Sequence, residues 1–312
     1  MGAYLGNAKI KPTIYLQEED TNKTRALINK TITSISANTS IIGSGAFAGC
    51  EYLTEINFPM CTDISVRAFE RCTSLSTINL PACTSIGAYA FQYCSALTEV
   101  NLPVCTSMGL SVFGQCTNLT SVNLPIMTSV NDYVFSNCTA LISVSIPLCE
   151  NIRGAFTNCS SLTSASFSLC TYIGQSAFVN CISLIEANFP VCSHIGGGAF
   201  SSCRSLVSIS FPGCKSIETS AFANCLALST VSFPACTRIS SYAFYSCKKL
   251  ISFYLMGSKT CTLGSTNTFF YTPMSNSTYT GAFGSIYVPS SMLSSYITAT
   301  NWTVYSSRIA GI

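Results

Sequence analysis

Residues 75–96 read LSTINLPACTSIGAYAFQYCSA, and residues 97–118 repeat the pattern as LTEVNLPVCTSMGLSVFGQCTN. The second copy begins 22 residues after the first, and the same spacing recurs along most of the chain. A fixed period between about 20 and 50 residues is the signature of a stacked repeat architecture. These two segments therefore predict an array of similar coils.

Cysteines mark the period in two series that are offset by half a repeat, and the chain contains 19 cysteines in all. The first series is Cys50, Cys72, Cys94, Cys116, Cys138, Cys159, Cys181, Cys203, Cys225 and Cys247. The second is Cys61, Cys83, Cys105, Cys149, Cys170, Cys192, Cys214 and Cys236, with Met127 at the position where one cysteine is missing. One residue is deleted between Cys149 and Phe156, where we expect a kink or a local narrowing.

One segment of each repeat has the alternation of a β-strand. Ile78 and Leu80 are apolar, Thr77 and Asn79 are polar, and Pro81 ends the hydrogen-bonding ladder. The few apolar side chains of one coil cannot form a core alone, so the coils must stack, with their strands about 4.8 Å apart in a parallel sheet.

The opposite half of each repeat, as in residues 87–95, is too short and too rich in glycine for a long helix. We expect a short second strand, a turn, or a single 3₁₀ or helical turn there. The predicted fold is thus a solenoid of about ten coils of 22 residues, with a parallel sheet of short strands on one face.

The chain is predicted to form one continuous structural domain with three parts. Residues 1–31 are irregular and richer in charge than the rest, as expected of a segment that caps the end of a solenoid. Residues 32–256 form the repeat array, and residues 257–312 form an insertion followed by a C-terminal cap. In this cap Ser290 or Ser291 is expected to cap a short helix through Tyr296, and Trp302 and Tyr305 are expected to pack back on the array.

Composition excludes several classes of protein. Only 9% of the residues are charged, whereas about a quarter is usual in a soluble domain. In a stack of coils a charged consensus position would become a column of like charges, which Ser, Thr and Asn avoid. No stretch approaches the roughly 18 apolar residues of a spanning helix, so we expect no membrane insertion. The net charge of +3 is spread along the chain without a basic run, so no nucleic-acid partner is predicted.

The cysteines are interpreted as free and buried apolar side chains. Cysteines at the same position of stacked coils have parallel Cα–Cβ bonds, which suit a disulfide poorly. The chain has no C-x-x-C pair and one histidine, His194, so it lacks the ligand spacing of a zinc site. Met127 at a cysteine position favours packing, while disulfides and metal binding are the alternatives. We therefore predict no metal and no other cofactor.

The pattern resembles the leucine-rich repeat, whose consensus L-x-x-L-x-L-x-x-[NC] is matched by Leu97, Val100, Leu102 and Cys105. The proline after the strand, the C-T-S-I-G-x-x-A-F-x-x-C half and the length of 22 residues are similar to the BspA-like, or Treponema-type, subfamily over about residues 41–256. The string YVPSSMLSSYITATNWTVYSSRI, residues 287–309, resembles the C-terminal cap of many such proteins. The resemblance implies a right-handed superhelix from a bacterial or protist surface protein that serves adhesion or protein recognition.

Leucine-rich repeats usually present their strand surface to partners, which makes the outward strand positions the candidate binding face. Its polar residues are Glu55, Asn57, Thr77, Asn79, Glu99, Asn101, Asn123, Glu186 and Asn188, with Tyr254 at the C-terminal end. Alternatively, the stacked asparagines hydrogen-bond one another and serve the fold. A second candidate surface is formed by tyrosines near the turns of the opposite half, namely Tyr89, Tyr93, Tyr133, Tyr172, Tyr242 and Tyr245.

No catalytic constellation is evident, and we expect the protein not to be an enzyme. His194 is interpreted as an exposed replacement for Ser or Thr, because no nucleophile or orienting carboxylate accompanies it in the sequence. Glu55 and Glu99 lie in one column two coils apart, roughly 9.6 Å by strand spacing, which allows an inverting-glycosidase pair on geometry alone. Nothing at this position would exclude water.

The expected function is non-enzymatic recognition or adhesion, with a host or bacterial surface protein or a glycan as the partner. The alternative is a structural or assembly component of a surface or phage-derived particle, and glycan processing is a remote possibility. The resemblance suggests a cell-surface or secreted protein, although Met1 to Lys11 lack the charged start and apolar core of a signal peptide.

Overall fold

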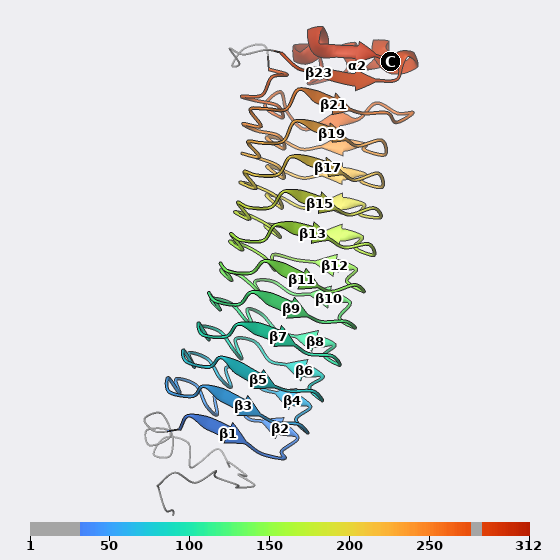
Figure 1. The fold of residues 1–312 in the computed structure, drawn as a ribbon. Helices are drawn as coiled ribbons and strands as arrows, with labels where there is room; N and C mark the ends of the chain where they lie inside the picture. The colour runs from blue at the N-terminus through green and yellow to red at the C-terminus, as the bar shows by residue number, and fades with distance from the viewer. Residues whose placement is uncertain (1–31, 276–282) are drawn as a thin grey trace, which may run out of the picture.

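The structure, a computed structural model, describes residues 32–275 and 283–312, and the predicted N-terminal cap at residues 1–31 lies outside the described residues. The described chain forms a parallel-strand β-solenoid of about 12 turns with about 22 residues per turn (Figure 1). This confirms the predicted fold class. The coils that contain β1 to β22 each place one strand on each of two faces. We call the surface formed by the odd-numbered strands up to β23 the strand face, and that formed by the even-numbered strands β2–β22 the second face.

The strand face contains β1 (Ser34–Ser36), β3 (Glu55–Asn57), β5 (Thr77–Asn79), β7 (Glu99–Asn101), β9 (Ser121–Asn123), β11 (Ser143–Ser145), β13 (Ser164–Ser166), β15 (Glu186–Asn188), β17 (Ser208–Ser210), β19 (Thr230–Ser232), β21 (Ser252–Tyr254) and β23 (Ser285–Val288). The second face contains β2 (Ile41–Ile42), β4 (Asp63–Ile64), β6 (Ser85–Ile86), β8 (Ser107–Met108), β10 (Ser129–Val130), β12 (Asn151–Ile152), β14 (Tyr172–Ile173), β16 (His194–Ile195), β18 (Ser216–Ile217), β20 (Arg238–Ile239) and β22 (Thr262–Leu263). Paired strands are parallel and in register from coil to coil, so that Ile56 lies opposite Ile78.

Phenylalanines form the centre of the core between the two faces. Phe69, Phe91 and Phe113 are fully buried, and their rings stack on one another along the array with centroids 5.2 and 5.3 Å apart. The column continues in both directions from Phe47 to Phe269. Each phenylalanine ring packs on the rings of the adjacent coils. The core is therefore continuous along the solenoid, and no coil has a core of its own.

The turn that contains the A-F-x-x-C motif is held by two residues with left-handed backbone. In one coil these are Tyr89, with φ of 62°, and Tyr93, with φ of 64°. The N–H groups of Tyr89, Phe91 and Tyr93 donate to carbonyls of the next coil at 2.9 Å each. The backbone of this half is thus bonded between coils rather than within a helix, in agreement with the expected short strand and turn.

The deleted residue shortens one turn between β12 and Phe156. β10, β12 and β14 still pair across this coil, whereas β11 and β13 belong to separate ladders. In Figure 1 the array leans in its N-terminal half and runs straighter beyond β13. The ladders are also interrupted between β5 and β7 and between β8 and β10, where the repeat length is unchanged.

The C-terminal end is covered by η2 (Ser290–Met292), α2 (Leu293–Thr298), η3 (Thr303–Arg308) and β24 (Ile309–Gly311), which pairs with β23. Trp302 is fully buried, and its Nε1 donates to the Cys261 carbonyl at 2.6 Å. The expected serine cap is wrong, because the N-cap positions are Pro289 and Met292 and neither makes a side-chain capping bond. In the described ranges no helix has the length and apolar character needed to cross a membrane.

Candidate functional site

All 19 cysteines are thiols that lie buried between the two faces. In the first series each thiol from Cys72 onward donates to a phenylalanine carbonyl of the preceding coil, as Cys94 Sγ does to Phe69 at 3.3 Å. In the second series Cys83 Sγ donates to the Ser85 carbonyl of its own coil at 3.4 Å. The cysteines are therefore small core residues that also supply a hydrogen bond, a role that the sequence interpretation did not include.

Burial favours the neutral form of thiols such as those of Cys105 and Cys116. Loss of hydration raises the pKa of Cys105 to about 11 and that of Cys116 to about 12. A neutral thiol is neither a good nucleophile nor a metal ligand. Among residues 32–275 and 283–312 no group of three or more His, Cys, Asp or Glu side chains is arranged to hold a metal ion.

The structure places the ten predicted candidate residues on the strand face, on strands spread from β3 to β21. Glu55, Asn57, Thr77, Asn79, Glu99, Asn101, Asn123, Glu186 and Asn188 are exposed, and Tyr254 is half-buried. Tyr254 stacks on Tyr287 with ring centroids 4.7 Å apart, which extends the face by one coil. Thr77 lies directly opposite Glu55 in the ladder, so Glu55 and Glu99 are separated by a whole coil.

Asparagines on the strand face are bonded along the stack. Asn79 Nδ2 donates to Asn57 Oδ1 at 2.6 Å, and Asn123 Nδ2 donates to Asn101 Oδ1 at 2.9 Å. Asn57 donates in turn to the Ser36 hydroxyl at 3.2 Å. These bonds support the structural interpretation, and they also hold the amides in a fixed row on the surface.

Exposed aliphatic residues border the strand face, a feature that the sequence interpretation missed. Immediately after the strands, five consecutive coils carry Val104, Ile126, Leu148, Leu169 and Val191, each between 38% and 48% exposed, and we call this set the aliphatic row. Immediately before the strands, Ile142, Ile185, Val207 and Ile251 are also exposed. The available signal was the position two residues after the last apolar residue of the strand segment, which is aliphatic in each of these five coils and follows a proline in four of them. A single exposed aliphatic residue is ordinary, but the repeat places five of them at the same position of consecutive coils, in one row along the array.

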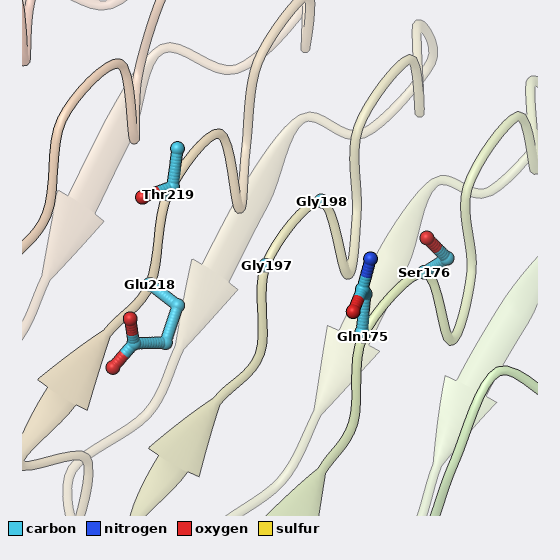
Figure 2. A pocket seen from close by; sticks show the side chains of 6 residues that line it. All are labelled: Gln175, Ser176, Gly197, Gly198, Glu218 and Thr219. Carbon is cyan, nitrogen blue, oxygen red and sulfur yellow. The ribbon is translucent and has the colours of Figure 1, made fainter.

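A shallow notch with a volume of about 480 Å³ lies beside the second face. It is lined by Gln175, Ser176, Gly197, Gly198, Glu218 and Thr219, which come from three successive coils (Figure 2).

Two aromatic rings lie near the notch. Tyr172 belongs to the coil that contributes Gln175, and His194 belongs to the coil that contributes Gly197. Tyr172 and His194 are parallel within 2°, with ring centroids 5.0 Å apart. His194 is half-buried, which corrects the expectation of an exposed side chain, and its Nδ1 lies 2.7 Å from the Ser216 hydroxyl. The other predicted tyrosines stay spread over the turns, where Tyr93 lies under the Arg71 guanidinium at 4.8 Å.

Comparison with known proteins gives a match to the family model described as the BspA type leucine-rich repeat region, in six copies that cover residues 23–142, 84–194 and 171–290. The solved structure of a leucine-rich repeat protein from Bacteroides ovatus is similar, with 27% identity and a TM-score of 0.51. That alignment covers 70% of this chain and 52% of the other, so this chain spans about half of that protein. A leucine-rich cell-surface protein from Faecalibacterium prausnitzii shares 22% identity, with a TM-score of 0.49 and coverage of 90% and 92%. No curated protein matches the chain.

Proposed function

Since the chain belongs to the BspA-type leucine-rich-repeat family, we propose that it is a non-enzymatic recognition module that binds a protein partner on its strand face. A bacterial cell-surface location is part of the same proposal and rests on the family. The partner class is a surface or matrix protein of the host or of another bacterium. Adhesion is the process that such binding would serve.

The aliphatic row is the observation that carries the proposal. Protein interfaces combine an apolar centre with a polar rim, and large exposed apolar patches mark such interfaces. Here five aliphatic side chains lie beside a polar face that is held by backbone pairing and by the asparagine bonds. A rigid surface loses little conformational entropy on binding, which offsets the scarcity of the Trp, Tyr and Arg anchors typical of interfaces.

The test is a binding screen of the full chain against purified matrix proteins, mucins and bacterial surface proteins by surface plasmon resonance. For a protein that binds, Leu148→Glu and Leu169→Glu place a charge in the aliphatic row, and each should weaken the complex at least about tenfold. Leu110→Glu is the matched control, because Leu110 is a similarly exposed leucine in the turn that follows the second-face strand β8. A screen without any protein ligand, or equal effects of all three substitutions, would contradict the proposal.

A further inference from the structure

The notch exists because one coil lacks side chains where its neighbours have them. Residues 195–200 read IGGGAF. Gly197 and Gly198 form the floor, with Gln175 and Ser176 on the coil to one side and Glu218 and Thr219 on the coil to the other (Figure 2). At the repeat position of Gly197 other coils carry Val66, Ala88 and Leu110.

Packing requires only the first glycine of this triplet. A Cβ at Gly196 would lie 2.5 Å from the Gly174 carbonyl carbon, which no side chain can tolerate. At Gly197 the nearest atom to an added Cβ is the Thr219 carbonyl oxygen at 3.4 Å, an ordinary contact. Gly198 has φ of +61°, but Tyr89 adopts the same conformation at the same repeat position. Two glycines thus keep the notch open although the fold does not need them.

An aromatic platform lies next to the notch on the same coils. Tyr172 is 40% exposed and stacks on His194, while other coils carry a small polar residue such as Ser85 or Ser107 at this position. Between the platform and the notch the two coils have Gly174 and Gly196 and the buried Ile173 and Ile195. No exposed side chain of these two coils therefore separates the two features. Tyr172 precedes Gln175 by three residues, and His194 precedes Gly197 by three residues, which corresponds to roughly 10 Å of extended backbone.

We propose that the notch and the Tyr172–His194 platform form a binding site for a neutral oligosaccharide. Tyr172 is exposed, and its ring, which is stacked on His194, offers an apolar surface to the C–H groups of a sugar ring. The amide of Gln175, the carboxylate of Glu218 and the neighbouring hydroxyls can donate to and accept from sugar hydroxyl groups.

Charge and backbone pairing disfavour the other classes of ligand. Glu218 is the one charged side chain that lines the notch, so an anionic ligand would meet a carboxylate without a cation. An extended peptide would need a free strand edge, whereas β14, β16 and β18 are each paired on both sides. The site is also separate from the strand face, so its occupation does not depend on the protein partner proposed above.

The test uses the full chain and three neutral trisaccharides, N,N′,N″-triacetylchitotriose, cellotriose and mannotriose, in saturation-transfer difference NMR. At least one of them should bind the wild-type protein. Gly197→Leu fills the notch with the residue that occupies this repeat position at Leu110, and Tyr172→Ser restores the common residue of the platform position. Each substitution should weaken binding at least about tenfold.

Ala88→Leu is the matched control, since it places the same leucine side chain at the same repeat position on a distant coil, and it should leave binding unchanged. Leu148→Glu in the aliphatic row should also leave sugar binding unchanged, which separates this site from the proposed protein interface. Lack of binding of all three trisaccharides at millimolar concentration would overturn the proposal. Binding that both Gly197→Leu and Tyr172→Ser leave intact would overturn it as well.

Discussion

At the scale of single residues, each repeat position recurs in successive coils, so that equivalent side chains form columns and make equivalent contacts. Cys138 is fully buried, and its thiol donates to the Phe113 carbonyl at 3.2 Å. The same carbonyl accepts the backbone N–H of Cys116 at 3.2 Å. Cysteine suits this position because it is small enough for the narrow interior and still supplies a donor, which alanine cannot do.

Replacement of Cys138 by alanine should therefore destabilise the protein by about 1–3 kcal/mol, because it removes buried volume and one hydrogen bond. Urea denaturation measures this loss. Thr139→Ala is the control, since Thr139 is exposed and its hydroxyl donates to the Thr117 carbonyl at 3.3 Å. It should change the free energy of unfolding by less than about 0.5 kcal/mol. Equal effects of the two substitutions would count against a role of the thiol column in stability.

Glycine shows the same dependence on position. Gly196→Ala places a Cβ 2.5 Å from the backbone of the preceding coil, whereas an added Cβ at Gly43 has no atom within 4 Å. We expect Gly196→Ala to cost about 1–3 kcal/mol or more through overpacking, and Gly43→Ala to be neutral or slightly stabilising. Thermal unfolding of the two variants checks this, and a Gly196→Ala variant as stable as the wild type would refute the close approach of the coils.

Among the elements of a coil, the short strands follow from the sequence and the turns do not. The alternation of Thr77, Ile78 and Asn79 is enough to place β5. The left-handed turn positions are hidden because residues such as Tyr89 and Arg67, which rarely adopt positive φ, occupy them in most coils.

The signal for these turns is the occasional glycine or asparagine at the same repeat positions, as at Gly45 and Asn137, which tolerate this conformation. The candidate residues on the strand face could be predicted from the same alternation, because the polar positions of each strand segment point outward. The sequence carries a signal for the aliphatic row as well, because one repeat position is aliphatic in five consecutive coils. The notch could not be predicted, because its shape depends on how neighbouring coils pack.

The thiol columns make the stability of the array sensitive to alkali. Burial raises the pKa of Cys116 from its ordinary value of 9.0 to about 12. Above pH 9 the unfolded chain releases this proton while the folded chain keeps it. The stability that the neutral thiol contributes is thus fully present below pH 9 and is lost as the pH rises toward 12, at up to about 1.4 kcal/mol per pH unit for one such thiol.

Urea midpoints measured between pH 8 and pH 11 should therefore be constant at first and then fall steeply. Cys116→Ala should show a shallower fall than the wild type, because it removes one of the titrating groups. Midpoints that stay constant to pH 11 would contradict the neutral, buried state of the columns.

At the scale of the whole molecule, stability depends on contacts between neighbouring coils and on cover at the ends. Trp302 provides this cover at the C-terminus through contacts with Phe269 and Tyr296, whose ring centroids lie 6.3 and 5.1 Å away. Trp302→Ala should lower the free energy of unfolding by about 3–5 kcal/mol, and the coils next to the cap should be destabilised first. Hydrogen exchange should then be faster in β22 and β23 and unchanged in β3–β9.

Ile297→Ala is the control for the cap, because Ile297 belongs to α2 and is exposed. It should leave exchange unchanged throughout the array. If hydrogen exchange in Trp302→Ala were faster by the same factor in all strands, the solenoid would unfold as one cooperative unit, which would contradict local fraying at its end.

The central claim is that the strand face and its aliphatic row bind a protein. Hydroxyl-radical footprinting of the complex with a protein found in the binding screen tests this claim directly, because exposed aliphatic side chains are oxidised and covered ones are protected. We predict protection of Leu148, Leu169 and Val191, with unchanged oxidation of Val66 and Leu110 in the turns on the other side of the coil. Protection of Val66 and Leu110 without protection of the aliphatic row would contradict the account.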